Sequence, residues 1–338
     1  MSAKYRVGII GCGGIARMHA AGYRAEPRCD VVALADIEEE TAQEFAEKSG
    51  FADAVLYADY REMLREEKPD IVSVCLWPDL HLPVTRDCVE AGVAAVHCEK
   101  PMAPTWGECL EFGTLAEESE TQITFNHQRR FNHGIRQARE LLDGGRFGEL
   151  QRMDLFAPGH LLDCGTHSLD LGFMFNGDNP AAWVIGQIDA RKVRPWFGVP
   201  SDFMSIGMFR FQNGVRGTIQ VGDEKELGTG VRLFGSGGFL EVFWNGAYGR
   251  YAVYEEPDWE PPEVEEPDPM PRVMGDIIDC LESGGEPELS VHKALQVTEV
   301  IFAIYESSRR RARIDLPLEI TDSPFISMLE SGEIGPQD

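Results

Sequence analysis

The sequence has no long apolar stretch and little positive charge. Charged residues interrupt every apolar run well before the about 20 residues that a membrane-spanning helix needs. The 31 Lys and Arg residues are outnumbered by 57 Asp and Glu residues, which gives a formal net charge of −26. Such a surface repels phosphate backbones and anionic lipid, so we expect no nucleic-acid partner and no membrane. The short apolar run at residues 7–10 is not typical of a secretory signal, and we expect a cytoplasmic protein.

The chain also lacks paired cysteines. Its eight cysteines include no C-x-x-C pair, which argues against a zinc knuckle or a dithiol redox motif. We therefore expect reduced thiols, most of them buried, and no metal site.

The sequence has 338 residues and the composition of an ordinary globular protein, and this length predicts about two domains. In the first part, short β-branched runs alternate with helical patterns. Alternation of this kind predicts βαβ units and a doubly wound parallel sheet, that is, an α/β Rossmann domain over residues 1–126. The predicted strands are residues 5–10, 31–36, 71–75, 93–98 and 122–125.

A different pattern follows and predicts a second domain of α+β type over residues 127–338. Two long strand patterns, residues 203–211 and 215–221, flank Asn213-Gly214, a pair favoured in type I′ hairpin turns. The acidic, proline-rich residues 255–269 predict an exposed loop. Helices are expected over residues 132–142, 163–175, 272–281 and 290–311, and the last of these elements could pack back on the first domain.

The strongest local signal is a glycine-rich turn between the first predicted strand and the helix after it. Gly11, Gly13 and Ala16 form a G-x-G-x-x-A motif that includes Gly14 and Ile15. Glycines there allow a tight turn and close approach of a pyrophosphate to a helix N-terminus. Asp36, which ends the second predicted strand, suits the ribose hydroxyls, and the glutamates behind it would repel a 2′-phosphate. These residues predict a dinucleotide cofactor, NAD in preference to NADP.

Two further positions carry groups suited to chemistry on an alcohol. Lys100 follows the predicted strand at 93–98, at the carboxyl edge where open α/β sheets bind ligands. Asp163 and His167 are four residues apart, which places them on one face of a predicted helix. A neutral histidine can accept the hydroxyl proton while a lysine holds the oxygen.

In order and separation, the glycine turn, Asp36, Glu99-Lys100-Pro101 and Asp163-x-Gly165-x-His167 resemble the Gfo/Idh/MocA oxidoreductases. The resemblance implies a second domain with an open, mostly antiparallel sheet, and a homodimer or homotetramer. It also implies an NAD(P)-dependent dehydrogenase that oxidises a secondary hydroxyl of a sugar, sugar derivative or cyclitol. By the same resemblance the site residues are Lys100, Asp163 and His167 for catalysis and substrate binding, Arg130 for substrate, and Pro78, His81 and Glu99 for the cofactor.

Departures from the family pattern leave alternatives open. Trp77 and Asp79 differ from the family's loop near Pro78, and the segment before Asp163 is shorter than in many members. His160, with Asp163 and His167, has a spacing that could also hold a metal ion. Two other functions stay open: a glycoside-cleaving or remodelling enzyme that oxidises its substrate transiently, and a dinucleotide-binding regulator without catalysis.

Overall fold

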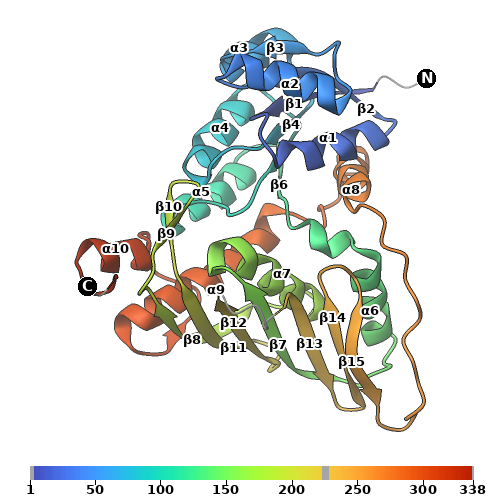
Figure 1. Cartoon of the computed structure of the whole chain (residues 1–338), viewed down its shortest axis with the longest axis vertical. Coiled ribbons are helices and arrows are strands. Elements are labelled where there is room, and N and C mark those ends of the chain that lie inside the picture. The colour runs from blue at the N-terminus through green and yellow to red at the C-terminus, as the bar shows by residue number, and fades with distance from the viewer. Residues whose placement is uncertain (1–3, 223–227, 337–338) are drawn as a thin grey trace. The chain divides into compact units, whose positions relative to one another are not determined.

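The structure is a computed structural model, and it describes residues 4–222 and 228–336 (Figure 1). The chain forms two compact units. Unit 1 runs to Ala103 and adds Glu108–Gln128 and Asp268–Ala294, whereas unit 2 holds Pro104–Gly107, Arg129–Pro267 and the chain from Leu295 onward. The main change of unit thus falls at residues 128/129, two residues beyond the expected division. A segment from late in the chain also belongs to unit 1.

Unit 1 contains a six-stranded parallel sheet with strand order β3-β2-β1-β4-β5-β6, which confirms the doubly wound Rossmann topology. Every residue of β4 and β5 is buried, as expected for strands covered on both faces. The strands are β1 (Tyr5–Ile10), β2 (Cys29–Ala35), β3 (Val55–Tyr57), β4 (Ile71–Val74), β5 (Ala95–Cys98) and β6 (Gln122–Phe125).

Helices connect these strands, and one helix from far along the chain joins them. They are α1 (Ala16–Ala25), α2 (Glu39–Ser49), α3 (Tyr60–Glu67), α4 (Pro78–Glu90), α5 (Trp106–Glu117) and α8 (Met270–Ser283). Helix α8 lies against α1 so closely that a Cβ on Gly22 would come within 3.0 Å of the Met270 carbonyl oxygen. Gly22 therefore permits this contact.

Unit 2 contains an eight-stranded sheet of order β15-β14-β13-β7-β12-β11-β8-β16. Only β7 and β12 pair in parallel, so the expected open, mostly antiparallel sheet is confirmed. Its strands are β7 (Leu150–Pro158), β8 (Ala181–Asp189), β11 (Met204–Phe211), β12 (Arg216–Gly222), β13 (Gly230–Gly235), β14 (Gly238–Phe243), β15 (Tyr248–Val253) and β16 (Ile314–Asp315).

The remaining elements of unit 2 are helical apart from one small hairpin. They are η1 (Gln128–Phe131), α6 (His133–Asp143), the π-helical turn η2 (Leu161–Gly165), α7 (Thr166–Phe175), β9 (Arg194–Trp196), β10 (Val199–Ser201), α9 (Val291–Arg310) and α10 (Pro324–Glu330). Every residue of α7 is buried, and Ile304 of α9 lies against Gly186 and Gly207 of the sheet.

The β11–β12 hairpin forms as expected, but its turn is not type I′. That turn needs positive φ at both central residues, and of the pair Asn213-Gly214 only Gly214 has it, at +93°. The Gly214 amide donates to the Phe211 carbonyl, and the Phe211 amide donates to the Val215 carbonyl. The connection is therefore a three-residue loop with a left-handed glycine.

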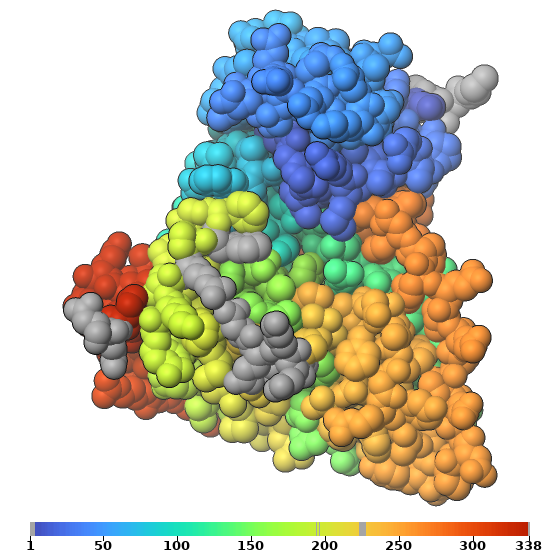
Figure 2. All heavy atoms as spheres, in the orientation of Figure 1, coloured from blue at the N-terminus to red at the C-terminus, as the bar shows by residue number. Residues whose placement is uncertain are grey.

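The acidic segment 255–269 is a loop, as predicted, and it is attached to unit 2. Glu266 accepts hydrogen bonds from the backbone amides of His133 and Gly134 at the start of α6. The Trp259 ring stands edge-on to Phe147 with centroids 5.6 Å apart. The orange atoms of this part of the chain lie on the face shown in Figure 2. Among the described residues, no helix is long and apolar enough to cross a bilayer.

Candidate functional site

The glycine turn of unit 1 has the geometry that its sequence predicts. Gly11 has φ of +87°, and a Cβ there would lie 2.4 Å from the Cys75 carbonyl oxygen, so only glycine fits. In contrast, a Cβ on Gly13 or Gly14 would meet no atom within 4 Å, and both residues are exposed. The backbone of the turn is thus open to a ligand.

Helix α1 begins at the end of this turn, and among its first amides that of Met18 donates to the Ile15 carbonyl at 3.0 Å. Its N-cap, Ile15, makes no side-chain cap, and the first turn of the helix contains no acidic residue. Uncapped amides and the positive end of the helix dipole attract a phosphate. The residues present therefore fit a dinucleotide pyrophosphate at Gly13, Gly14 and the start of α1.

Asp36 lies directly after β2 and is joined to this turn. Its Oδ2 accepts a hydrogen bond from the Cys12 amide at 2.8 Å, and its Oδ1 accepts one from the Glu38 amide at 3.0 Å. Both bonds leave carboxylate lone pairs for other donors. Burial and the nearby Asp36 charge raise the pKa of the Cys12 thiol to about 12, so this cysteine stays protonated.

Pro78 and His81 lie at the start of α4, at the carboxyl edge of the parallel sheet, where β4 ends. The buried His81 ring lies between two backbone carbonyls, with Nε2 3.0 Å from the Leu76 oxygen and Nδ1 2.9 Å from the Pro101 oxygen, and a neutral ring donates to one of them. His81 thereby ties the loop after β4 to the loop that carries Lys100. Burial lowers its pKa. The cofactor contact expected of Pro78 and His81 stays a prediction.

Glu99 precedes Lys100 and is held in a buried cluster. Its Oε1 accepts from His19 Nε2 at 2.9 Å and from Asn126 Nδ2 at 2.6 Å, and its Oε2 accepts from the Lys100 amide at 3.1 Å. Burial alone raises the pKa of this carboxyl, but those hydrogen bonds and the charges of His19 and Lys100 bring it down to about 2. Glu99 is therefore an ionised group inside unit 1.

Unit 2 carries Asp163 and His167 on consecutive helical elements. Asp163 lies in the π-helical turn η2, and α7 begins at Thr166, so the helix expected from residue 163 starts as a π-turn and continues as an α-helix. The wider turn is closed by a hydrogen bond from the Gly165 amide to the His160 carbonyl at 3.0 Å. Such π-turns are frequent at functional sites.

A buried carboxylate anchors this turn. Asp202 accepts hydrogen bonds from the Leu161 amide at 3.4 Å, from Ser205 Oγ at 2.6 Å and from Tyr305 Oη at 2.6 Å. The start of η2 is thus fixed to β11 and α9.

Two residues of this part of unit 2, Trp244 beside His167 and Arg129 beside Trp244, were not predicted from the sequence. The Trp244 ring stands edge-on to the His167 ring with centroids 5.3 Å apart, and its Nε1 donates to Ser168 Oγ at 3.1 Å. The Arg129 guanidinium lies 5.4 Å from the centre of the Trp244 ring. Trp244 precedes an Asn245-Gly246 turn, and this was the signal that could have marked a loop residue of the site.

Arg130, the expected substrate ligand, has a different environment from Arg129. Its side chain is 0% exposed. Nε donates to the Asp170 carboxylate at 2.9 Å and Nη2 to Asp178 at 2.8 Å, which joins η1 to α7 and to the turn after it. Its role in this unit is structural, and a substrate contact stays a prediction.

No group of three His, Cys, Asp or Glu side chains in the described part of the chain is arranged to hold a metal ion.

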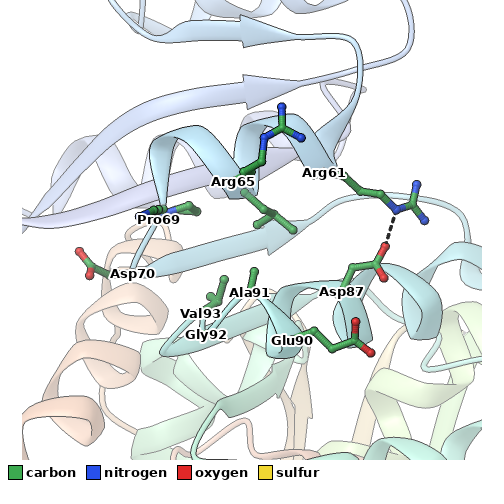
Figure 3. Close-up of a pocket in the computed structure, with 11 residues that line it drawn as sticks. Arg61, Arg65, Pro69, Asp70, Asp87, Glu90, Ala91, Gly92 and Val93 are labelled. Carbon is green, nitrogen blue, oxygen red and sulfur yellow. Dashed lines mark ion pairs between the residues drawn. The ribbon is translucent and has the colours of Figure 1, made fainter.

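A groove of about 720 Å³ in unit 1 lies between α3 and α4 (Figure 3). It is lined by Asp70 and Gly92, which precede strands β4 and β5, and an Arg61–Asp87 ion pair at 2.9 Å lies on it. The groove is therefore at the amino edge of the sheet, opposite the glycine turn and Lys100.

Comparison with protein families agrees with these two units. Residues 5–127 match the family model described as oxidoreductase family, NAD-binding Rossmann fold, and residues 149–316 match oxidoreductase family, C-terminal alpha/beta domain. The chain belongs to the Gfo/Idh/MocA oxidoreductase family, with a nicotinamide-dinucleotide-binding Rossmann domain. The expected family is thus confirmed.

Similar proteins include sugar and cyclitol dehydrogenases. The chain is 23% identical to the D-apiose dehydrogenase of Paraburkholderia graminis, over 98% of this chain and 95% of that protein. It is 24% identical to the myo-inositol 2-dehydrogenase of Thermotoga maritima, over 69% and 73%. A levoglucosan dehydrogenase solved in complex with NADH aligns with a TM-score of 0.81 at 19% identity, covering 94% of this chain and 100% of that one. At that identity the structural likeness shows the fold.

Proposed function

We propose that this protein is an NAD-dependent dehydrogenase that transfers hydride between a secondary hydroxyl of a sugar, sugar derivative or cyclitol and the nicotinamide. The observation that carries the proposal is the open glycine turn, with Asp36 bonded to it, in a chain whose near full-length relative is a sugar dehydrogenase. Sugar and cyclitol relatives support the substrate class.

The proposed chemistry divides the work between Lys100, Asp163 and His167. When bound, the nicotinamide accepts the hydride from the carbinol carbon. His167 takes the hydroxyl proton as general base, and the Lys100 ammonium donates a hydrogen bond to the oxygen and favours the alkoxide. Asp163 binds the substrate beside His167. The Trp244 ring, held by Ser168, limits the orientations of the imidazole.

The preference for NAD rests on the residues after β2. Asp36 has lone pairs left to accept from ribose hydroxyls, and Ile37 and Glu38 after it are exposed. An acidic loop disfavours a 2′-phosphate, so we propose NAD over NADP.

A substrate screen tests this function. The purified protein is incubated with NAD or NADP and a panel of sugars, cyclitols and glycosides, and formation of the reduced cofactor is followed by absorbance. We expect steady NADH formation with at least one sugar or cyclitol, at a rate at least about tenfold above that with NADP. Cleavage of a glycoside without net NADH would support transient oxidation. Dinucleotide binding with no product from any compound would support the regulator.

A further inference from the structure

A buried chain of hydrogen bonds in unit 1 connects helix α1 to the peptide of Lys100. His19, on the second turn of α1, is 0% exposed and bonds through both ring nitrogens. Its Nε2 lies 2.9 Å from Glu99 Oε1, and its Nδ1 lies 2.9 Å from Ser73 Oγ. The Ser73 hydroxyl is also 2.9 Å from the Tyr23 hydroxyl. Neither Tyr23, Ser73 nor His19 has a part in the proposed chemistry.

Both ring nitrogens of His19 have a partner in this chain. Glu99 is ionised and can only accept, so His19 Nε2–H donates to it. On the other side of the ring, His19 Nδ1 and the Tyr23 hydroxyl both lie within hydrogen-bond distance of the Ser73 hydroxyl, and burial raises the pKa of Tyr23 well above its usual value. The carboxylate is therefore oriented by an imidazole that is held at both nitrogens.

The other oxygen of Glu99 faces Lys100. Glu99 Oε2 accepts the Lys100 backbone amide at 3.1 Å, while Asn126 Nδ2 holds Oε1 at 2.6 Å. Asn126 follows β6, Glu99 follows β5 and His19 is on α1, so three elements fix one carboxylate. The peptide of Lys100 is bonded to that carboxylate.

Stability alone does not account for this cluster. A buried carboxylate costs several kcal/mol of desolvation, and apolar residues of similar volume would fill the space without that cost. The arrangement does, however, define where the backbone of Lys100 lies, and such supporting contacts tune functional groups.

We propose that His19 is a positioning residue for Lys100 and acts through the Glu99 carboxylate. The inference rests on the proposed function, because it takes Lys100 as the group that contacts the reacting oxygen. His19 orients Glu99, Glu99 holds the Lys100 peptide, and the ammonium thereby meets the substrate oxygen in one geometry.

A double-mutant cycle tests this inference with the substrate found in the screen. We expect His19→Ala to lower kcat by about 10- to 100-fold with little change in the Kd for NADH. In a Lys100→Ala background, the same change should alter kcat by less than about twofold, because residues that act as one unit are not additive. If the double variant instead loses kcat by the product of the two single losses, the proposal is overturned.

His97 supplies a matched control. Its ring is buried, lies 4.9 Å from the His19 ring and bonds to Thr124 Oγ1. His97→Ala removes the same buried volume, so we expect a comparable drop in Tm but kcat within about twofold of wild type. An equal loss of kcat in His97→Ala would show that the effect of His19 is only structural and would overturn the proposal.

Two milder variants cover the case in which His19→Ala does not fold. His19→Gln keeps an amide donor towards Glu99 and should retain more kcat than His19→Ala, and Ser73→Ala removes the partner of Nδ1 and should fall between His19→Ala and wild type. Unchanged kcat in Ser73→Ala and an additive loss in His19→Gln with Lys100→Ala would overturn the positioning role. Full turnover by Lys100→Ala alone would instead contradict the catalytic assignment of the proposed function.

Discussion

Arg130 is the largest of the fully buried side chains in the described structure, and its burial determines its role. Its charge is balanced by Asp170, itself 1% exposed, and by Asp178. Arg129, the preceding residue, is half-buried against Trp244 and forms no ion pair with a carboxylate of the described residues, so these two neighbours in sequence have different environments.

This difference predicts contrasting effects of substitution. Arg130→Met leaves Asp170 buried without its partner, so we expect the free energy of unfolding to fall by about 3 to 5 kcal/mol. Arg129→Met should cost less than about 1 kcal/mol, because no buried carboxylate loses a partner. Urea denaturation of both variants gives these values. A stable Arg130→Met protein with a raised KM would restore the sequence-based expectation of a substrate ligand.

Sequence could predict residues whose role follows from local backbone chemistry. The positions of Gly11 in a tight turn and of Asp36 at a strand end are predictable, because short sequence motifs mark both features. It could not distinguish Arg129 from Arg130, since burial depends on contacts with Asp170 and Asp178, 40 or more positions away. Trp244 was missed for the same reason.

At the scale of elements, the two turns that carry the candidate site differ in how far sequence predicts them. The glycine turn and the start of α1 fall where the motif places them. The expected helix with His167 forms, but its first residues are the π-turn η2, whose start Asp202 fixes, and the α-helix begins at Thr166. Helical spacing in a sequence does not distinguish a π-turn from an α-helix. In the same way, the pair Asn213-Gly214 predicted a turn but not its type.

The open geometry of the glycine turn gives a prediction for the cofactor. A Cβ on Gly13 meets no atom of unit 1, so Gly13→Ala should leave Tm unchanged, yet it should raise the Kd for NADH at least about tenfold by blocking the pyrophosphate. Gly11→Ala is the contrasting variant. Its Cβ would overlap the Cys75 carbonyl, so we expect a lower Tm. Unaltered NADH affinity in Gly13→Ala would place the dinucleotide elsewhere.

At the scale of the whole molecule, the order of the sequence does not map simply onto the two units. Helix α8 lies near the end of the chain but belongs to unit 1, against α1. Its amphipathic pattern predicted a helix but not its neighbour, because Gly22 and Met270 are far apart in sequence. The class of each unit was predictable, since strand alternation and hairpin patterns are local signals.

We propose that Lys100 of unit 1 and His167 of unit 2 both act in the proposed hydride transfer. The most direct measurement is turnover and NADH affinity in Lys100→Ala and His167→Asn, singly and together. We predict that each change lowers kcat by at least about 100-fold, that the double variant is little worse than either, and that the Kd for NADH stays within about threefold. Near wild-type turnover in either single variant would contradict the account.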